Sequence, residues 1–585
     1  MANNSPGFAD PLKILFLTHG FNSLAQRLHV ELTRRGFEIS VELDISDAVS
    51  CEAVTLFQPD LIIAPFLKRA IPAMIWQQFR CLIVHPGIIG DRGPSALDWA
   101  IMEDQPQWGV TVLQANAEMD AGDIWASQVF PMRFATKSSL YRREVVEAAT
   151  TAVLQAISRL QSGTYTPIPL NYADPNVLGR LHTPIMQTDR TIVWEHDSTR
   201  TILKKIHAAD GFPGVLDSIE GVAYYLYDAH AEDRLRGIPG NIIAKRQNAI
   251  CRATVDGAVW IGFLKQKSDT HPTFKIAATL ALQDSLADVP EIHLDAFASE
   301  TGCTYRDIWF EHEAGVGYLH FSFYNGAMDT RQCERLREAY LQAADTSVRI
   351  IVLMGGPDFW SNGIHLNHIE YASSPADESW RNINAMDDLV LAIIANTRQL
   401  TVAALQGNAG AGGVFLSLAA DYIYARTSVI LNPHYKNMGN LYGSEYWTYL
   451  LPRRVSSEQA RQLMETRLPI GAMEAQQQGL IDACLTLDHV DFGKRIKEMA
   501  TSMAASTNYL QQLEKKQLLR QIDEQRKPLQ SYRSEELQRM PLNFYGFDPS
   551  YHVARYHFVY KRPHGWTPRY LARHRSKKRQ TTAGV

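Results

Sequence analysis

Residues 81–125 read CLIVHPGIIGDRGPSALDWAIMEDQPQWGVTVLQANAEMDAGDIW, and this stretch decides how the first third of the chain is organised. The apolar run at its start is typical of a buried strand. It ends abruptly at His85-Pro86-Gly87, so the imidazole is expected at the C-terminal end of that strand. In open α/β sheets this edge is where ligands bind. A Gly-rich turn, a helix from about Ser95 and a second strand over 110–113 are predicted to follow.

Beyond the second strand the chain makes the turn Met119-Asp120-Ala121-Gly122-Asp123. A histidine that leaves one strand and an aspartate in the turn after the next can meet over one cleft, and such a pair suits acyl transfer. A single histidine on an apolar strand is more often a core residue. The paired turns around His85 favour a site instead, and the stretch therefore predicts that His85 and Asp120 act together.

These residues resemble the catalytic stretch of enzymes that use formyltetrahydrofolate, such as methionyl-tRNA formyltransferase. That family builds its site from an Asn-x-His segment, an Arg-Gly turn and an Asp-x-Gly-Asp turn, which match His85, Arg92-Gly93 and Asp120–Asp123 here. One position departs, because Ile83 stands where the family has its catalytic Asn. The resemblance implies that His85 and Asp120 are catalytic and that the cofactor is 10-formyltetrahydrofolate. The folate contacts it implies are Ile88, Arg92 and Gly122.

The rest of the N-terminal region alternates strands and helices. Strands are predicted over 13–18, 38–43 and 59–65, and helices over 23–35 and 138–160. This alternation predicts a doubly wound parallel sheet, and we assign residues 1–165 to one formyltransferase-like domain. No GxGxxG follows the first strand, which disfavours a dinucleotide site. The Pro-containing segment NYADPNVLGRLHTP is interpreted as a linker.

Residues 186–270 have a different pattern, in which one helix is followed by short strands and frequent turns. This pattern predicts a small β-rich domain. A domain of this kind follows the catalytic domain in formyltransferases, where it carries substrate-specific contacts. A purely structural module is the alternative.

Two further Gly-rich turns lie in residues 304–505. A strand over 350–354 precedes Asn362-Gly363-Ile364, and a strand over 401–405 precedes Ala411-Gly412-Gly413. Two such turns, each opening a helix, resemble the crotonase superfamily of enoyl-CoA hydratases and isomerases. Unpaired N–H groups at helix N-termini can stabilise a thioester oxyanion. The resemblance implies a CoA domain whose oxyanion-hole and CoA-binding residues are Ile364, Gly412, Asn362, Gly363 and Gly413.

The catalytic carboxylates of the hydratase branch are missing from this domain. Their positions hold Phe415 and His434, so addition of water to an enoyl-CoA is not expected. Tyr435 and Glu445 lie close by in the sequence and are the candidate catalytic pair. The alternative is that both are ordinary wall residues with satisfied hydrogen bonds.

Residues 506–585 are predicted to form a charged helical tail that becomes basic and aromatic over 555–579. A basic and aromatic tail can bind nucleic acid. Packing of its aromatic side chains against the body is the favoured interpretation, because the whole chain of 585 residues has a net charge of −4. We therefore expect no nucleic-acid partner.

Composition places the protein in a reducing cytoplasm. Six cysteines are scattered without a CxxC pair or a Cys/His cluster of zinc spacing, so no metal site and no disulfide framework are expected. The N-terminal segment lacks the pattern of a signal peptide. No apolar run approaches the roughly 20 residues of a membrane helix, so no membrane association is expected.

The order of the two halves resembles a family of maturation proteins that make the CO ligand of [NiFe]-hydrogenases. This resemblance implies formyl transfer from 10-formyltetrahydrofolate to coenzyme A, followed by decarbonylation of formyl-CoA to CO and CoA. Its implied partners are the two small-molecule substrates and the maturation proteins that accept CO. Two alternatives stay open: an amine formyltransferase fused to a domain that processes an unrelated acyl-CoA, and a sensor that binds both ligands without turnover.

Overall fold

The computed structural model describes residues 11–576 in two compact units, which we treat separately. The first unit contains the chain up to Arg190, the short segment 207–212 and the stretch from Pro563 onward. The second unit contains 191–206 and 213–562. Residues 1–10, which make up most of the segment that lacks a signal-peptide pattern, and residues 577–585, which include the end of the basic tail, lie outside the described residues.

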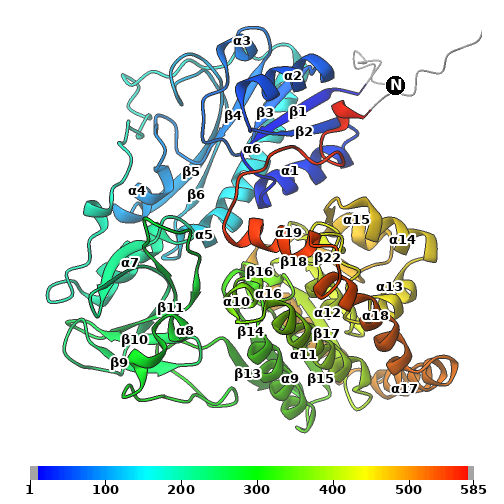
Figure 1. The fold of residues 1–585 in the computed structure, drawn as a ribbon. Helices are drawn as coiled ribbons and strands as arrows, with labels where there is room; N and C mark the ends of the chain where they lie inside the picture. The colour runs from blue at the N-terminus through cyan, green and yellow to red at the C-terminus, as the bar shows by residue number, and fades with distance from the viewer. Residues whose placement is uncertain (1–10, 577–585) are drawn as a thin grey trace, which may run out of the picture. The chain divides into compact units, whose positions relative to one another are not determined.

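The first unit is built on a six-stranded sheet in the order β2-β1-β3-β4-β5-β6 (Figure 1). The first four strands are parallel, as predicted, and the sheet then continues into the antiparallel strands β5 and β6. The strands are β1 (Lys13–Thr18), β2 (Glu38–Leu43), β3 (Leu61–Ala64), β4 (Cys81–His85), β5 (Gln107–Gln114) and β6 (Ile124–Pro131). The helices are α1 (Ser23–Arg34), α2 (Asp47–Phe57), α3 (Ala73–Trp76), α4 (Ala96–Met102), α5 (Lys137–Leu140) and α6 (Val146–Ser162).

Local sequence explains where the first helix starts and stops. The side chain of Asn22 accepts a hydrogen bond from the Ala25 N–H and so caps α1. Gly36 follows the helix at φ +87°, a left-handed conformation that favours glycine. The predicted apolar face of α1 is confirmed as buried, and it comprises Leu24, Leu28 and Leu32.

Residues 563–576 belong to the first unit, where they reach the edge strand β2 (Figure 1). The Leu571 carbonyl accepts the Val41 N–H at 3.0 Å, so this segment covers part of a sheet edge. The carboxylate of Glu42, which is fully buried, lies 2.8 Å from His574 Nε2 and also binds Thr567. The aromatic side chain of Trp566 remains 74% exposed, whereas Leu571 and Ala572 are buried, so this segment is attached by apolar as well as polar contacts.

The second unit begins with the predicted β-rich domain. Its strands follow the order β7-β8-β11-β10-β9, with β12 added beside β11, and all of these pairs are antiparallel. The strands are β7 (Val215–Ile219), β8 (Val222–Glu232), β9 (Ile242–Arg246), β10 (Ala249–Ala253), β11 (Ala258–Gln266) and β12 (Ile276–Ala277). Helix α7 (Thr199–Ala209) precedes them and is divided between the two units.

The C-terminal domain of the second unit contains two sheets. The larger has the order β13-β14-β15-β17-β19-β22, and the smaller has the order β16-β18-β20-β21. The strands are β13 (Ile308–Glu313), β14 (Val316–Phe321), β15 (Ile350–Leu353), β17 (Leu400–Leu405), β19 (Tyr422–Arg426) and β22 (Ala483–Leu485), and β16 (Phe359–Ser361), β18 (Asn408–Gly410), β20 (Ile430–Asn432) and β21 (Ile470–Gly471). In the larger sheet the strands from β14 to β22 run parallel.

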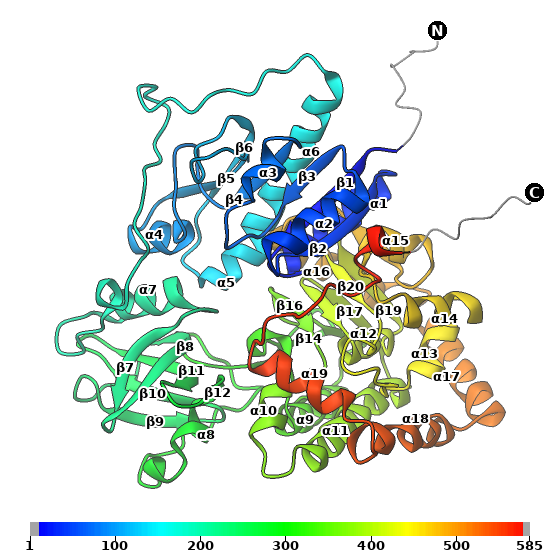
Figure 2. The ribbon, with the colours of Figure 1, turned by 45° about the horizontal axis from the view of Figure 1, so that its top comes forward.

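Helices enclose this domain, and the predicted helical tail packs on it (Figure 2). Helix α18 lies against α11 and α13, and α19 lies against α10. The helices used below are α10 (Leu366–Tyr371), α11 (Pro375–Ala395), α12 (Gly412–Leu418), α13 (Trp447–Arg454), α17 (Tyr509–Arg526), α18 (Leu529–Phe544) and α19 (Ser550–Val559). Within residues 11–576, no helix combines the length and apolar character needed to cross a bilayer.

Candidate active sites

His85 is the last residue of β4 and is buried, with 5% of its surface exposed. Two side chains from the neighbouring strand β5 hold the turn that follows it. Thr111 Oγ1 donates to the Gly87 carbonyl at 2.9 Å, and Trp108 Nε1 donates to the Pro86 carbonyl at 2.8 Å. The imidazole therefore sits on a rigid turn at the strand end predicted from the sequence.

Two carboxylates flank the imidazole of His85. Its Nδ1 lies 3.6 Å from Asp120 Oδ2, so the structure brings the predicted pair together. Its Nε2 lies closer, at 2.8 Å, to Oδ2 of Asp91, a residue outside the motifs that predict the site. Burial lowers the pKa of His85, but the hydrogen bond to Asp91 and the charge of Asp120 outweigh it, and the net shift is upward.

Glycine at position 87 makes the His85–Asp91 contact possible. A Cβ at this position would come within 2.4 Å of both His85 Nε2 and Asp91 Oδ2. Any other residue would therefore push the two groups apart. Asp91 itself could have been suspected as an acidic residue in the Gly-rich turn directly before Arg92, although that signal is weak.

The far side of Asp91 is occupied by His182, from the segment interpreted as a linker. His182 Nδ1 lies 3.0 Å from Asp91 Oδ1, and its ring stacks on Trp99 with centroids 5.6 Å apart. His182 Nε2 lies 3.6 Å from Glu103 Oε1. The linker is thus part of the site, and no local pattern in the sequence indicated this role.

The Arg-Gly turn and the Asp-containing turn bind each other. The Gly93 N–H donates to Asp120 Oδ2 at 3.3 Å, and Arg92 Nε donates to the Met119 carbonyl at 3.0 Å. Asp120 has φ +54°, and a Cβ on Gly122 would lie 1.7 Å from the Gln114 carbonyl oxygen. Close backbone approach therefore requires glycine at position 122.

The remaining predicted residues of this site line its turns and strand. Ile88 is partly exposed and lies beside Gly109, where an added Cβ would be 3.2 Å from Ile88 Cγ2. Ile83 is partly exposed on β4, between Ala64 of β3 and Leu113 of β5. The strand therefore presents an aliphatic side chain at the position where the resembled family has an amide.

In the second unit the two predicted Gly-rich turns lie against each other. A Cβ on Gly363 would be 3.3 Å from the Gly412 nitrogen, and a Cβ on Gly413 would be 2.0 Å from the Ser361 carbonyl oxygen. Trp360 Nε1 also donates to the Gly413 carbonyl at 2.9 Å. The two turns are therefore fixed as one assembly, as an oxyanion hole requires.

The residues around these turns keep them in place. Asn362 Nδ2 donates to the Asn325 carbonyl at 2.8 Å, and Ile364 forms an isolated parallel bridge with Met328. Ala411, at φ +48°, directly precedes the helix α12 that Gly412 opens. Asn362 therefore stabilises the turn itself, in addition to its predicted contact with CoA.

Tyr435 and Glu445 form a direct hydrogen bond, so the structure unites the predicted pair. The phenol hydroxyl also lies 3.0 Å from the Ser444 carbonyl. A Cβ on Gly412 would come within 2.6 Å of Glu445 Oε1, which places this carboxyl group directly beside the second turn. Phe415 stacks on the Tyr435 ring with centroids 5.5 Å apart and so forms the wall behind the phenol.

Burial dominates the electrostatics of this pair. It raises the pKa of Glu445 to about 7, although hydrogen bonds from Tyr435 and Ser444 oppose the shift. It also raises the pKa of Tyr435 well above its usual range, and the charge of Glu445 adds to that effect. His434 is buried as well, and burial lowers its pKa to about 4. Glu445 is therefore the group suited to exchange a proton near neutrality.

Comparisons with known proteins agree with this two-site organisation. A formyl transferase family model matches residues 13–157, a formyl transferase C-terminal domain model matches 184–274, and an enoyl-CoA hydratase/isomerase model matches 311–568. Both resemblances inferred from the motifs are thereby confirmed.

Similarity to two proteins extends over nearly the whole chain. Hydrogenase maturation factor HoxX of Bradyrhizobium diazoefficiens is 52% identical over 567 residues, which cover 97% of this chain and 98% of that protein. The crystal structure of HypX from Aquifex aeolicus in complex with tetrahydrofolic acid matches with a TM-score of 0.94 at 48% identity, covering 97% of this chain and 99% of that chain. A 4-chlorobenzoyl coenzyme A dehalogenase of an Arthrobacter species is 28% identical over 212 residues, which cover 36% of this chain and 76% of that enzyme.

Proposed function

Because the chain belongs to the HoxX and HypX family of hydrogenase maturation factors, we propose that it produces carbon monoxide in two steps. The first transfers a formyl group from 10-formyltetrahydrofolate to coenzyme A, and the second splits formyl-CoA into CO and CoA. The observation that carries the proposal is the Tyr435–Glu445 pair beside Gly412, at the position where a thioester would meet an oxyanion hole. The proposed recipients of CO are hydrogenase maturation proteins.

In the first step the CoA sulfur forms a bond to the formyl carbon, and the bond from that carbon to the folate nitrogen breaks. The thiol proton goes to the departing nitrogen, so nothing else is consumed. Asp91 accepts the Nε2–H of His85, which leaves Nδ1 facing Asp120 to handle that proton. Asp120 stabilises the imidazolium when it forms.

Folate binding is proposed at the turns around this histidine. The structure of the Aquifex relative holds tetrahydrofolic acid, and the turns of Ile88, Arg92 and Gly122 surround His85 in this chain. Arg92 is already paired with Glu118 at 2.7 Å, so its contribution would be to shape the turn as well as to contact the ligand. Ile83 supplies no hydrogen bond, and we infer that the better nucleophilicity of a thiol compensates for the missing amide.

In the second step the formyl C–H bond and the C–S bond of formyl-CoA break, giving CO and the thiol of CoA. The proton leaves carbon and ends on sulfur, so the step needs no further reactant. The N–H groups of Ile364 and Gly412 would polarise the thioester carbonyl, with Asn362, Gly363 and Gly413 shaping the CoA side. Glu445, with a pKa of about 7, can take the formyl proton and return it to a thiolate, whose conjugate acid has a pKa of about 8.5.

The test is to incubate the purified full-length protein with 10-formyltetrahydrofolate and CoA and to trap CO with deoxyhaemoglobin. CO formation that requires both substrates is the expected result. Formate or a formylated amine as the product, without CO, would show another transferase. Binding of both ligands without any turnover would show a sensor.

A further inference from the structure

The backbone that carries Glu445 is strained. Glu445 and the next residue, Tyr446, have φ values of +61° and +58°, in the left-handed region that favours glycine. This conformation is unfavourable in an L-amino-acid chain, and strain of this kind persists only where surrounding contacts impose it. Helix α13 begins immediately after Tyr446, so the strained pair forms the turn that enters this helix.

Two buried acidic side chains, one from α11 and one from α18, bind the amides of this turn. Asp387 Oδ1 accepts the Glu445 N–H at 2.7 Å. Glu536 accepts the Tyr446 N–H at 2.9 Å and the Thr448 N–H at 2.8 Å. Asp387 and Glu536 are both fully buried, at 0% exposure. Two buried side chains that are far apart in the sequence thus bind the amides of two consecutive strained residues.

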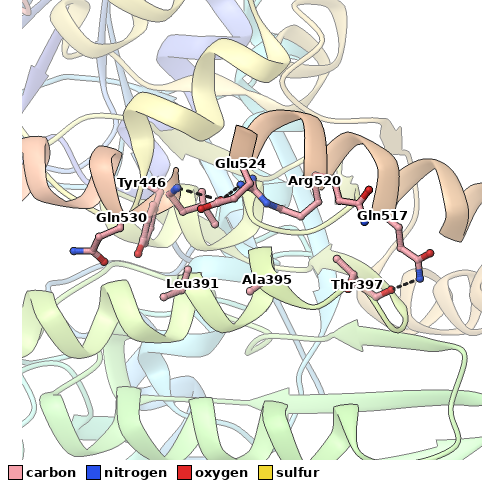
Figure 3. Close-up of a pocket in the computed structure, with 10 residues that line it drawn as sticks. Leu391, Ala395, Thr397, Tyr446, Gln517, Arg520, Glu524 and Gln530 are labelled. Atoms are coloured by element: carbon pink, nitrogen blue, oxygen red, sulfur yellow. Dashed lines mark hydrogen bonds and ion pairs between the residues drawn. The ribbon is translucent and has the colours of Figure 1, made fainter. Parts of the chain in front are cut away.

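Tyr446 is almost fully buried, with 1% of its surface exposed, and its side chain belongs to the hydrophobic core. Tyr446 lines a pocket of about 580 Å³ between α11 and the tail helices, whose other lining residues include Leu391, Arg520 and Gln530 (Figure 3). The turn therefore joins Glu445, which lies beside the second Gly-rich turn, to a residue that packs in the core and borders this pocket. Core packing of Tyr446 and the hydrogen bonds to Asp387 and Glu536 together fix this backbone.

Asp387 acts as a neutral hydrogen-bond acceptor and not as a charged group. Its Oδ2 makes no hydrogen bond with any residue in the described part of the chain, and the nearest cation, Arg533 Nε, lies 3.7 Å away. Burial and the neighbouring carboxyl groups of Glu445 and Glu536 raise its pKa well above the usual range, which favours the neutral acid. A neutral amide of the same shape would therefore preserve its role.

We propose that Asp387 and Glu536 are positioning residues that hold Glu445 in its strained conformation against the oxyanion turn, which makes the tail helix α18 a working part of the decarbonylation site. This inference rests on the proposed function of Glu445. It extends the site to residues that touch neither substrate nor the reacting atoms.

The test compares variants of the full-length protein for CO release from supplied formyl-CoA. Asp387→Ala should lower kcat by about 10²-fold, since a misplacement of about 1 Å can cost that much, while KM changes little. Asp387→Asn keeps the accepting oxygen and should restore most of the rate with an unchanged pH profile. Glu536→Gln leaves one accepting oxygen for two N–H groups and should give an intermediate loss.

Glu535→Gln is the matched control, because Glu535 is the exposed neighbour on the same helix and pairs with Lys527. It should behave like the unchanged protein. Circular dichroism and the KM for formyl-CoA report folding of each variant. If Asp387→Asn is as inactive as Asp387→Ala, Asp387 acts by acid–base chemistry, and full activity of Asp387→Ala removes its role altogether. Either outcome overturns the inference, whereas absence of CO from the unchanged protein refutes the proposed function instead.

Discussion

The two candidate sites adjust acid–base groups by opposite means. At His85 two carboxylates favour the charged form of the imidazole against its burial, and the pKa rises. At Glu445 burial favours the neutral form of the carboxyl group, and hydrogen bonds only moderate the shift to about 7. Charge therefore stabilises the protonated imidazole at the first site. At the second site burial brings the pKa of the carboxyl group close to neutral pH, so that it can exchange a proton. Each arrangement suits the step proposed for it.

The largest effect is expected from Tyr435 and Glu445, the pair proposed to handle the formyl proton. Glu445→Gln removes the proton acceptor with almost no change in volume and should lower CO release by about 10³-fold, within the range for a positioned acid–base group. Tyr435→Phe should have a smaller effect in the same direction. Mass spectrometry should then detect formyl-CoA that accumulates from 10-formyltetrahydrofolate and CoA.

Formyl transfer provides the internal control for that experiment, because His85 belongs to the other unit. Loss of 10-formyltetrahydrofolate should continue until free CoA is exhausted. Wild-type CO release by both variants would show that Tyr435 and Glu445 are not catalytic. His434 would then be the next residue to test.

A somewhat smaller loss is expected at the charge-based site. His85→Ala should lower formyl transfer by at least about 10²-fold, the lower end for an acid–base group. Asp120→Asn should also impair transfer, since it removes a negative charge 3.6 Å from Nδ1. Release of CO from supplied formyl-CoA should be preserved in both variants. Normal transfer in a folded His85→Ala protein would end the assignment.

A third prediction distinguishes the role of Asp91 from that of Asp120, the two carboxylates beside His85. Asp91→Asn removes one of the charges that raise the imidazole pKa, so that pKa should fall. If transfer requires neutral His85, the acid limb of the rate profile should move to lower pH. The expected loss of rate at neutral pH is about 10-fold, because a hydrogen bond to a charged group contributes about 1.5–3 kcal/mol.

The control for this third prediction is Glu118→Gln, which changes an exposed carboxylate paired with Arg92 in the adjoining turn. Its pH profile should match that of the unchanged protein. An acid limb that stays in place in Asp91→Asn would show that Asp91 does not influence the titration of His85.

The sequence predicted the parts of both sites that are coded by local motifs. His85, Asp120 and the Gly-rich turns follow from strand ends, turn residues and spacing, because these features fix the backbone locally. Asp91 was passed over because one acidic residue in a turn has many ordinary explanations. His182 was missed because its role depends on where a linker crosses the site, which no periodicity records.

The second site shows the same limit more clearly. Tyr435 and Glu445 are ten positions apart and were found by proximity to a motif, but Asp387 and Glu536 reach the site through tertiary packing. Asp387 lies within α11 and Glu536 within α18, and a single acidic residue in a helix does not by itself indicate a site. Contacts over such separations arise from the assembled fold, so local reasoning cannot predict them.

The smallest expected effect is on stability and not on turnover. It tests whether burial raises the pKa of Glu445. Glu445 has an ordinary pKa of 4.5 and a folded pKa of about 7, so the folded form binds its proton more tightly. The stability that this group contributes is present below pH 4.5 and is lost as the pH rises through about 7. Glu445→Gln removes this loss, and its melting temperature should exceed that of the unchanged protein at pH 8 by roughly 1–3 °C. At pH 5 the two proteins should melt together, and exposed Glu535→Gln should show no such dependence. A Glu445→Gln protein that is equally destabilised at both pH values would mean that Glu445 is not held neutral by burial, and the contrast between the two sites would fail.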